Sequence, residues 1–203
     1  MAMLEKSDEN ILRLLLKDIA KKHTITSLSK EIGIKRPGTW KALKRLESKS
    51  LINLAPIGEG KTSAYEVTLN WKNPLAEKTL AAILTEDSLK QEKWMHNFKE
   101  LENQVEFLIL FGSILHSPKE ANDIDILNLV INKKNFTKLD KIIRNIQITQ
   151  NKKIHTIDIT KEELKEELKE ELKDGNKAYL DAFKKCIVIF GQENFIKFIK
   201  SLQ

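Results

Sequence analysis

Two aspartates separated by one residue are the side chains of this sequence best suited to hold a metal ion. Period-two alternation along a strand would direct the carboxylates of Asp123 and Asp125 to one face. Gly112 and Ser113 precede the pair by nine intervening residues, and a Gly-Ser turn lets the backbone approach a phosphate. Mg²⁺ is usually bound by one or two carboxylates together with substrate phosphates. The spacing therefore predicts a site for a divalent metal and a nucleotide.

Short apolar segments on either side would position these residues. Residues 107–111 are five large apolar side chains ended by the Gly-Ser break, which predicts a buried strand. Residues 123–126 predict a second strand, residues 136–145 a helix and residues 154–159 a third strand. Asp158 lies in the third strand. Alternation in that strand puts Asp158 on one face and His155 on the other.

This order of elements resembles the nucleotidyltransferase superfamily related to DNA polymerase β, in particular its minimal bacterial and archaeal members. The resemblance implies that Asp123 and Asp125 bind Mg²⁺ or Mn²⁺ and that Asp158 completes the metal site and assists the attacking hydroxyl. It also implies that Gly112 and Ser113 contact the triphosphate of an NTP substrate. The expected reaction moves a nucleoside monophosphate to a hydroxyl of a protein or an RNA. Related minimal enzymes modify partner toxins or tRNA, so toxin–antitoxin biology is a further expectation.

The turn after Ser113 departs from the family pattern. Minimal nucleotidyltransferases usually continue with a small residue, a basic residue and a second glycine, whereas this chain has residues 114–117 with the letters ILHS. Lys119 or His116 would have to replace the missing basic residue. This departure favours an alternative, a DNA-binding transcription regulator whose nucleotidyltransferase fold is a catalytically degenerate nucleotide sensor or dimerisation scaffold. A third hypothesis is an antitoxin that acts through protein contact.

The first third of the chain carries most of the net positive charge. The net charge is +6, and residues 1–70 hold 13 Lys and Arg against 8 Asp and Glu. The same segment predicts an amphipathic helix over residues 7–22, a second helix capped by Thr26 and ended by Gly33, and a third opened by Pro37. A hairpin over residues 52–54 and 64–69 would follow. This layout resembles the winged helix-turn-helix domains of archaeal and bacterial transcription regulators.

The third helix is the expected DNA reader, because its apolar spacing leaves a basic face toward solvent. The residues predicted to contact DNA lie on this helix, at its start and in the wing: Lys35, Arg36, Trp40, Lys41, Lys44 and Lys61. Phosphate contacts of this kind would make binding strongly salt-dependent. Winged helices also serve as protein-interaction and RNA-binding modules, and solvated lysines are the simplest alternative.

The complete prediction is an α+β protein with three parts. A winged helix-turn-helix domain covers residues 1–70, a helical connector residues 71–103, and a small mixed-sheet nucleotidyltransferase-like domain with flanking helices residues 104–203. The longest apolar runs are too short to span a bilayer, and Met1–Lys6 lacks the apolar stretch of a signal peptide. The single cysteine, Cys186, excludes an intramolecular disulfide and is expected to be buried. These features predict a cytoplasmic protein, and paired winged helices commonly act as dimers, so a homodimer is also expected.

Overall fold

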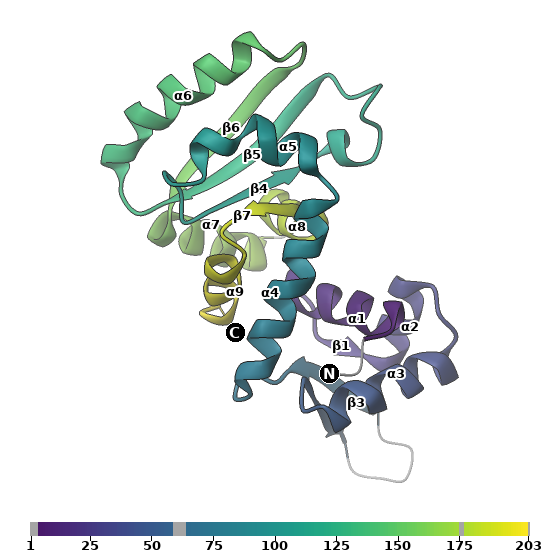
Figure 1. Ribbon diagram of the computed structural model, residues 1–203. Helices are drawn as coiled ribbons and strands as arrows, with labels where there is room; N and C mark the ends of the chain where they lie inside the picture. The colour runs from purple at the N-terminus through teal and green to yellow at the C-terminus, as the bar shows by residue number, and fades with distance from the viewer. Residues whose placement is uncertain (1–3, 59–63, 175–176, 203) are drawn as a thin grey trace. The chain divides into compact units, whose positions relative to one another are not determined.

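The computed structural model describes residues 4–58, 64–174 and 177–202 (Figure 1). The chain divides into two compact units, whose boundary in the sequence lies between Ile83 and Leu84. Among the described residues, no helix has the length and apolar character needed to cross a bilayer. The α+β class is confirmed, because each unit combines helices with a sheet.

The first unit is a winged helix. Its elements, in chain order, are α1 (Lys6–Lys17), β1 (His23–Thr24), α2 (Ile25–Ile32), α3 (Arg36–Ser48), β2 (Ile52–Ile57) and β3 (Ala64–Leu69). The strands form an antiparallel sheet in the order β1-β3-β2. The predicted helix over residues 7–22 is too long, because the chain leaves α1 after Lys17 and then forms β1. The predicted cap at Thr26 is also wrong: Thr24 has the extended conformation of a cap, and its hydroxyl accepts a hydrogen bond from the Ser27 N–H (3.2 Å).

Helix α3 has one buried face and one exposed face. Pro37 lies in its first turn, where the absence of an N–H costs nothing. Thr39, Leu43 and Leu46 are fully buried, as their helical spacing predicts. Burial of this side fixes the rotation of α3 and leaves the opposite side for solvent or a partner.

A bidentate ion pair joins α3 to α1. The Arg45 guanidinium donates from Nη2 to Asp8 Oδ1 (2.7 Å) and from Nε to Asp8 Oδ2 (3.2 Å). Only 1% of the Asp8 side chain is exposed, so water cannot take the place of the Arg45 guanidinium beside the carboxylate. The hydrogen bond to Asp8 is the main reason that the pKa of Arg45 is raised. The fork geometry restrains both the distance and the rotation between the two helices.

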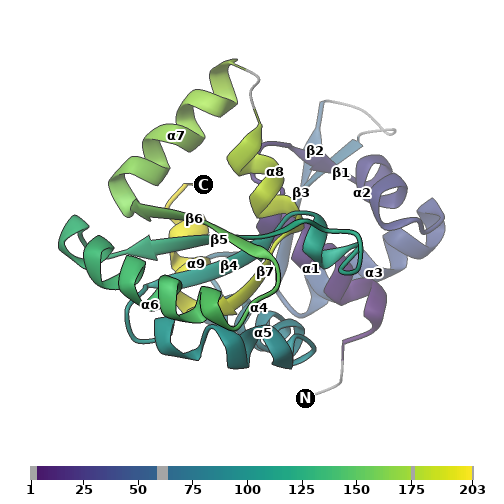
Figure 2. The ribbon, with the colours of Figure 1, turned by 90° about the horizontal axis from the view of Figure 1, so that it is seen from above.

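The second unit is built on a four-stranded mixed sheet with the order β6-β5-β4-β7 (Figure 2). Strand β4 pairs antiparallel with β5 and β7, and β5 pairs parallel with β6. Its strands are β4 (Phe107–Phe111), β5 (Asp123–Val130), β6 (Lys153–Thr160) and β7 (Ile187–Phe190). Its helices are α4 (Pro74–Leu89), which begins before the boundary, α5 (Glu92–Asn97), α6 (Phe136–Ile148), α7 (Lys161–Asp174), α8 (Ala178–Lys185) and α9 (Gln192–Lys200), with short 3₁₀ turns at Lys99–Leu101, Ser113–Leu115 and Lys133–Asn135.

Helices cover both faces of this sheet. Helix α6 lies on one side and the α8 and α9 helices lie on the other (Figures 1 and 2). On the α6 side, Ile124, Ile126 and Ile154 belong to one buried cluster with Leu139 and Ile143 of α6. On the other side, the Phe107 ring meets aromatic rings of α8 and α9, with centroid separations of 5.3–6.5 Å to Phe183, Phe195 and Phe198. The two faces of each strand therefore have different surroundings.

Replacing Asp8 with asparagine is expected to lower the free energy of unfolding of the first unit by about 2 kcal/mol. The change keeps a side-chain oxygen but leaves the Arg45 charge without its buried partner. Breaking a fully buried ion pair would cost more free energy, but 34% of the Arg45 side chain is exposed. Urea unfolding of the full chain, followed by circular dichroism, measures the change. Glu47→Ala, which removes the exposed partner of Lys44, is the control and should cost less than about 0.5 kcal/mol. Equal losses in the two variants would show that the Asp8 pair does not hold α1 and α3 together.

Candidate functional site

The two predicted carboxylates lie on one face of the sheet at the start of β5. Asp125 pairs across the antiparallel ladder with Phe111, the last residue of β4, so Gly112 follows directly beside it. Gly112 has φ +82° and ψ −165°, a conformation that is essentially restricted to glycine. A Cβ on Gly112 would overlap Asp125 Oδ2 and lie 3.2 Å from Asp125 Cγ. The structure therefore brings Gly112, Asp123 and Asp125 together, and it explains why residue 112 is glycine.

A histidine that the sequence analysis did not assign to the site completes this cluster. His155 is the register partner of Asp125 on the parallel strand β6. Its Nδ1 lies 3.3 Å from Asp123 Oδ2 and 3.5 Å from Asp125 Oδ1. Burial, followed by the neighbouring Asp123 charge, raises the pKa of Asp125, while His155 acts in the opposite direction. One nitrogen and two carboxylate oxygens within 4.8 Å of one another could hold a divalent cation.

Asp158 is not brought to this cluster, which corrects the predicted set of three acids. Its register partner is Asn128, and paired residues of parallel strands point to the same face, so Asp158 lies on the face opposite Asp123 and Asp125. There its Oδ1 accepts hydrogen bonds from Asn128 Nδ2 and Thr156 Oγ1, both 2.8 Å long. The fully buried Asn128 gives Asp158 a structural partner. The alternation predicted within β6 is confirmed, but the position opposite the aspartate pair belongs to His155.

The turn after Gly112 is a short 3₁₀ helix, Ser113–Leu115, with an exposed Ser113. Ile114 is only 2% exposed and belongs to the buried cluster beneath α6. The segment in which the resemblance predicts a phosphate-contacting turn contributes the Ile114 side chain to the core instead. His116 and Lys119, the predicted substitutes for the missing basic residue, are both exposed.

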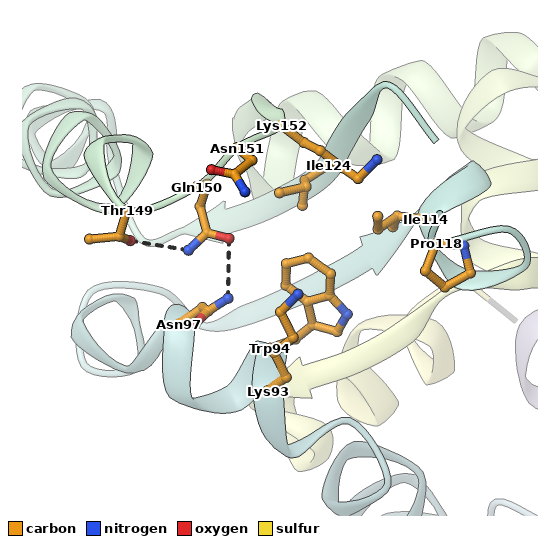
Figure 3. Close-up of a pocket in the computed structure, with 10 residues that line it drawn as sticks. All are labelled: Lys93, Trp94, Asn97, Ile114, Pro118, Ile124, Thr149, Gln150, Asn151 and Lys152. Carbon is orange, nitrogen blue, oxygen red and sulfur yellow. Dashed lines mark hydrogen bonds between the residues drawn. The ribbon is translucent and has the colours of Figure 1, made fainter. Parts of the chain in front are cut away.

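A pocket of about 300 Å³ lies on the other face of the sheet (Figure 3). Trp94 and Ile124 are among its lining residues, with Lys93 Nζ 4.8 Å from the centre of a Trp94 ring. Asn97 Nδ2 donates to Gln150 Oε1 (3.3 Å) at its edge. Because Ile124 points away from Asp123 and Asp125, this pocket and the carboxylate pair are separated by the sheet.

The predicted DNA-reading residues of α3 form an exposed basic face. Lys35, Arg36, Lys41 and Lys44 are exposed, whereas Trp40 is half-buried. The Trp40 ring lies 5.6 Å from the Tyr65 ring of β3, and Lys44 Nζ lies 4.8 Å from the Trp40 ring centre. Lys44 also pairs with Glu47 (2.7 Å), and Arg36 donates to the Thr26 hydroxyl. Lys61 lies outside the described residues.

Comparisons with known proteins support the winged-helix architecture of the first unit. A family described as winged helix-turn-helix DNA-binding matches residues 4–53, a segment that contains α1, α2 and α3. The search of curated proteins found no match. Similar solved structures include those of three bacterial proteins, each with a low TM-score. A ZitR mutant from Lactococcus lactis is 23% identical with a TM-score of 0.33, over 50% of this chain and 62% of that chain.

The other two structures match longer parts of the chain. The heme sensor protein PefR from Streptococcus agalactiae, in complex with heme, is 16% identical with a TM-score of 0.35, over 73% of this chain and 76% of that one. The adhesin competence repressor AdcR from Streptococcus pyogenes is 17% identical with a TM-score of 0.33, over 71% and 80%. The matched segment covers 62% of the ZitR mutant, which is less than two thirds of the length of that protein. At these TM-scores the likeness does not establish a shared fold, and neither the matching family nor any of these three proteins is described as a nucleotidyltransferase.

Replacing Gly112 with alanine is expected to lower the free energy of unfolding by about 2–3 kcal/mol, because residue 112 has a glycine-only conformation and the new methyl group displaces Asp125. Gly33→Ala is the control. Gly33 also has a positive φ of +69°, in the ordinary left-handed region, and an added Cβ would meet no atom within 4 Å, so the expected loss is about 1 kcal/mol. Urea unfolding compares the two variants. A smaller loss for Gly112→Ala than for Gly33→Ala would contradict the packing of Gly112 against Asp125.

Proposed function

We propose that this protein is a DNA-binding transcription regulator whose second unit binds a metal-bound nucleotide without the full machinery for its transfer. The observation that carries the proposal is the exposed basic face of α3, on a helix whose opposite face is buried. This helix lies in the segment that matches the winged helix-turn-helix DNA-binding family. The atypical turn after Ser113 also favours a regulator over a nucleotidyltransferase.

Three cations of this face are the best candidates for phosphate contacts. Lys35 precedes α3, Arg36 begins it and Lys41 lies in its second turn, and all three are exposed. The start of a recognition helix is the part that enters the major groove in helix-turn-helix proteins. Lys44 is a weaker candidate, because Glu47 and the Trp40 ring already neutralise or cover its ammonium. Trp40 contacts the Tyr65 ring of β3, which gives it a packing role within the first unit.

The second unit supports binding better than catalysis. Asp123 and Asp125 would share a divalent cation, which would offset the repulsion between two carboxylates on one strand edge. Gly112 has no side chain, so the Asp125 carboxylate packs directly against its backbone. A third acid on the same face is replaced by His155, and the turn that would contact phosphates is packed into the core through Ile114. Mg²⁺ or Mn²⁺ with an NTP is the proposed ligand of the two carboxylates, with His155 beside the metal and not bound to it, because Mg²⁺ prefers oxygen ligands.

Nucleotidyl transfer to a hydroxyl of a protein or RNA remains the second candidate function. The observation that favours it is the position of His155, since an imidazole beside the metal ligands could accept the proton of an attacking hydroxyl. The attacking oxygen would form a bond to the α-phosphorus, and pyrophosphate would leave. Release of pyrophosphate from NTP in the presence of a protein or RNA acceptor distinguishes this function from binding alone.

The triple variant Lys35→Ala/Arg36→Ala/Lys41→Ala is expected to bind duplex DNA about tenfold more weakly or worse, because three phosphate contacts are lost. The slope of log affinity against log salt concentration should fall by about three, one for each contact. Fluorescence anisotropy with a labelled duplex over a range of salt concentrations measures both quantities.

A charge-matched control separates these contacts from general attraction. Lys134→Ala/Lys138→Ala/Lys141→Ala removes three exposed cations from α6 and the turn before it. This variant should retain the wild-type affinity and salt slope. If it loses as much affinity as the α3 variant, DNA is not read by α3.

Calorimetric titration of Mg²⁺-NTP into the full chain tests the second unit. Asp123→Asn/Asp125→Asn is expected to abolish metal-dependent binding, because the amides that remain are poor partners for the cation. Asp158→Asn should bind as the wild type does, since Asp158 lies on the other face of the sheet. Loss of binding in Asp158→Asn alone would restore the sequence-based set of three acids. If the wild type binds none of the four nucleotides, the proposed Mg²⁺-NTP ligand is wrong, but the DNA-binding proposal is unaffected.

A further inference from the structure

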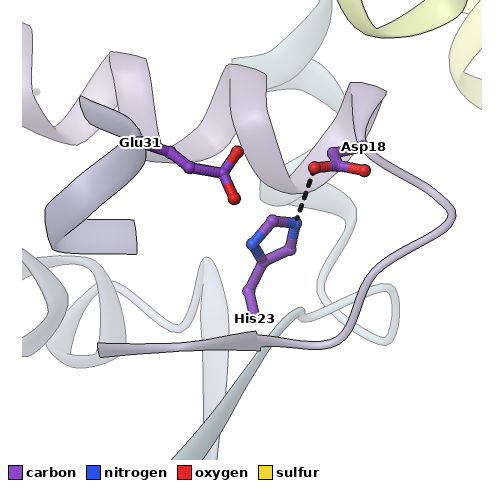
Figure 4. A group of neighbouring side chains, drawn as sticks. All are labelled: Asp18, His23 and Glu31. Carbon is purple, nitrogen blue, oxygen red and sulfur yellow. Dashed lines mark ion pairs between the residues drawn. The ribbon is translucent and has the colours of Figure 1, made fainter. Parts of the chain in front are cut away.

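A second cluster of metal-binding side chains lies in the winged helix unit, far along the sequence from the aspartate pair (Figure 4). Asp18 follows the last residue of α1, His23 begins β1 and Glu31 lies in the last turn of α2. Candidate ligand atoms of the three side chains all lie within 4.8 Å of one another. Figure 4 shows the carboxylates of Asp18 and Glu31 directed toward the His23 ring from two different elements.

The imidazole of His23 is the unexplained group in this cluster. Only 3% of the side chain is exposed, and neither ring nitrogen has a hydrogen-bond partner among the described residues. The Nε2 atom lies 3.7 Å from Asp18 Oδ2, which is an electrostatic contact but too long for a hydrogen bond. A buried polar atom without a partner costs free energy, and native structures rarely leave two on one ring. Something with affinity for imidazole nitrogen is therefore expected at this position.

We propose that Asp18, His23 and Glu31 bind a first-row transition-metal dication of the Zn²⁺ type. An imidazole nitrogen with two carboxylate oxygens is a donor set that zinc accepts, whereas Mg²⁺ prefers oxygen ligands alone. Three protein ligands would leave one position of a tetrahedral site for water or another ligand. The metal would satisfy one of the two orphaned ring nitrogens of His23 and hold the charges of both carboxylates.

The surroundings of the three side chains suit metal binding. Asp18 is nearly as buried as His23, with 6% of its side chain exposed. Glu31 reaches the surface and pairs with Lys21, whose side chain is 47% exposed and can leave when a metal arrives. Glu31 thus provides a path from solvent to the buried donors.

A bound metal would join three elements that otherwise meet through packing. It would link the end of α1, the start of β1 and the last turn of α2, and α2 packs against α3. Metal occupancy would therefore stabilise the unit that presents the basic face of α3. The inference rests on the cluster alone and does not depend on the function proposed above.

The test uses the full chain with Asp123→Asn/Asp125→Asn as the parent, so that the other cluster cannot contribute. Zn²⁺ is titrated in competition with a chromophoric chelator, and thermal unfolding is followed with and without Zn²⁺. The parent should bind one equivalent of Zn²⁺, and its unfolding temperature should rise. Glu31→Gln should lower the affinity about tenfold or more, since even second-shell partners contribute that much, and should remove the rise. Co²⁺ should give the intense visible absorption of a tetrahedral site in the parent and a weaker one in Glu31→Gln.

Two controls make the outcome decisive. Lys21→Met removes the ion pair to Glu31 but keeps the ligand, so it should bind Zn²⁺ at least as tightly as the parent; a loss equal to that of Glu31→Gln would mean that the ion pair, and not ligation, matters. Mg²⁺ should not raise the unfolding temperature of the parent. A rise as large as that caused by Zn²⁺ would contradict the assignment to a transition-metal dication. Absence of Zn²⁺ binding by the parent, or unchanged binding in both Glu31→Gln and His23→Gln, would overturn the site.

Discussion

The parallel register between β5 and β6 decides which polar side chains of the second unit can act together. Asp125 lies opposite His155 and Asn128 lies opposite Asp158, so a shift of one residue would exchange the two faces. The register is fixed by the apolar side chains that alternate with the polar ones, because Ile124 and Ile154 pair within the core beneath α6. Packing of isoleucines thus selects an imidazole, and not a third carboxylate, as the neighbour of the aspartate pair.

The first unit depends on a similar coupling between buried and exposed sides. Helix α3 can present cations to solvent because Thr39, Leu43 and Leu46 are buried and because the Asp8 carboxylate holds Arg45 from α1. Arg45 shows that a basic residue of α3 need not belong to the set that is proposed to contact DNA. Its charge is used inside the unit, while Lys35 and Lys41 remain available.

Local patterns predicted most elements, and partners distant in the sequence were the main source of error. The five apolar residues before Gly112, the alternation around Ile124 and the helical spacing of Leu43 and Leu46 each require only neighbouring residues, and the structure agrees with them. The register of two strands joined by a helix cannot be read from either strand alone, so Asp158 was expected where His155 lies. The cluster of Asp18, His23 and Glu31 could not be predicted for the same reason. Strand β1 is too short to show alternation, and it brings His23 close to residues of two helical segments. The cap at Thr24 was missed because the two-residue β1 gives no periodic signal.

The two polar clusters share a composition of one histidine and two carboxylates, but they differ in burial, and burial sets the chemistry. In the second unit 33% of the Asp123 side chain, 25% of that of Asp125 and 47% of that of His155 are exposed, so a cation bound there would keep part of its water shell and could exchange a water for a phosphate oxygen. In the first unit the exposed fractions of His23 and Asp18 are 3% and 6%. A metal bound there must give up water to protein donors, which zinc does more readily than Mg²⁺ because imidazole nitrogen binds it well. One histidine and two carboxylates would therefore form an exchangeable ligand site in one unit and retain a metal in the other.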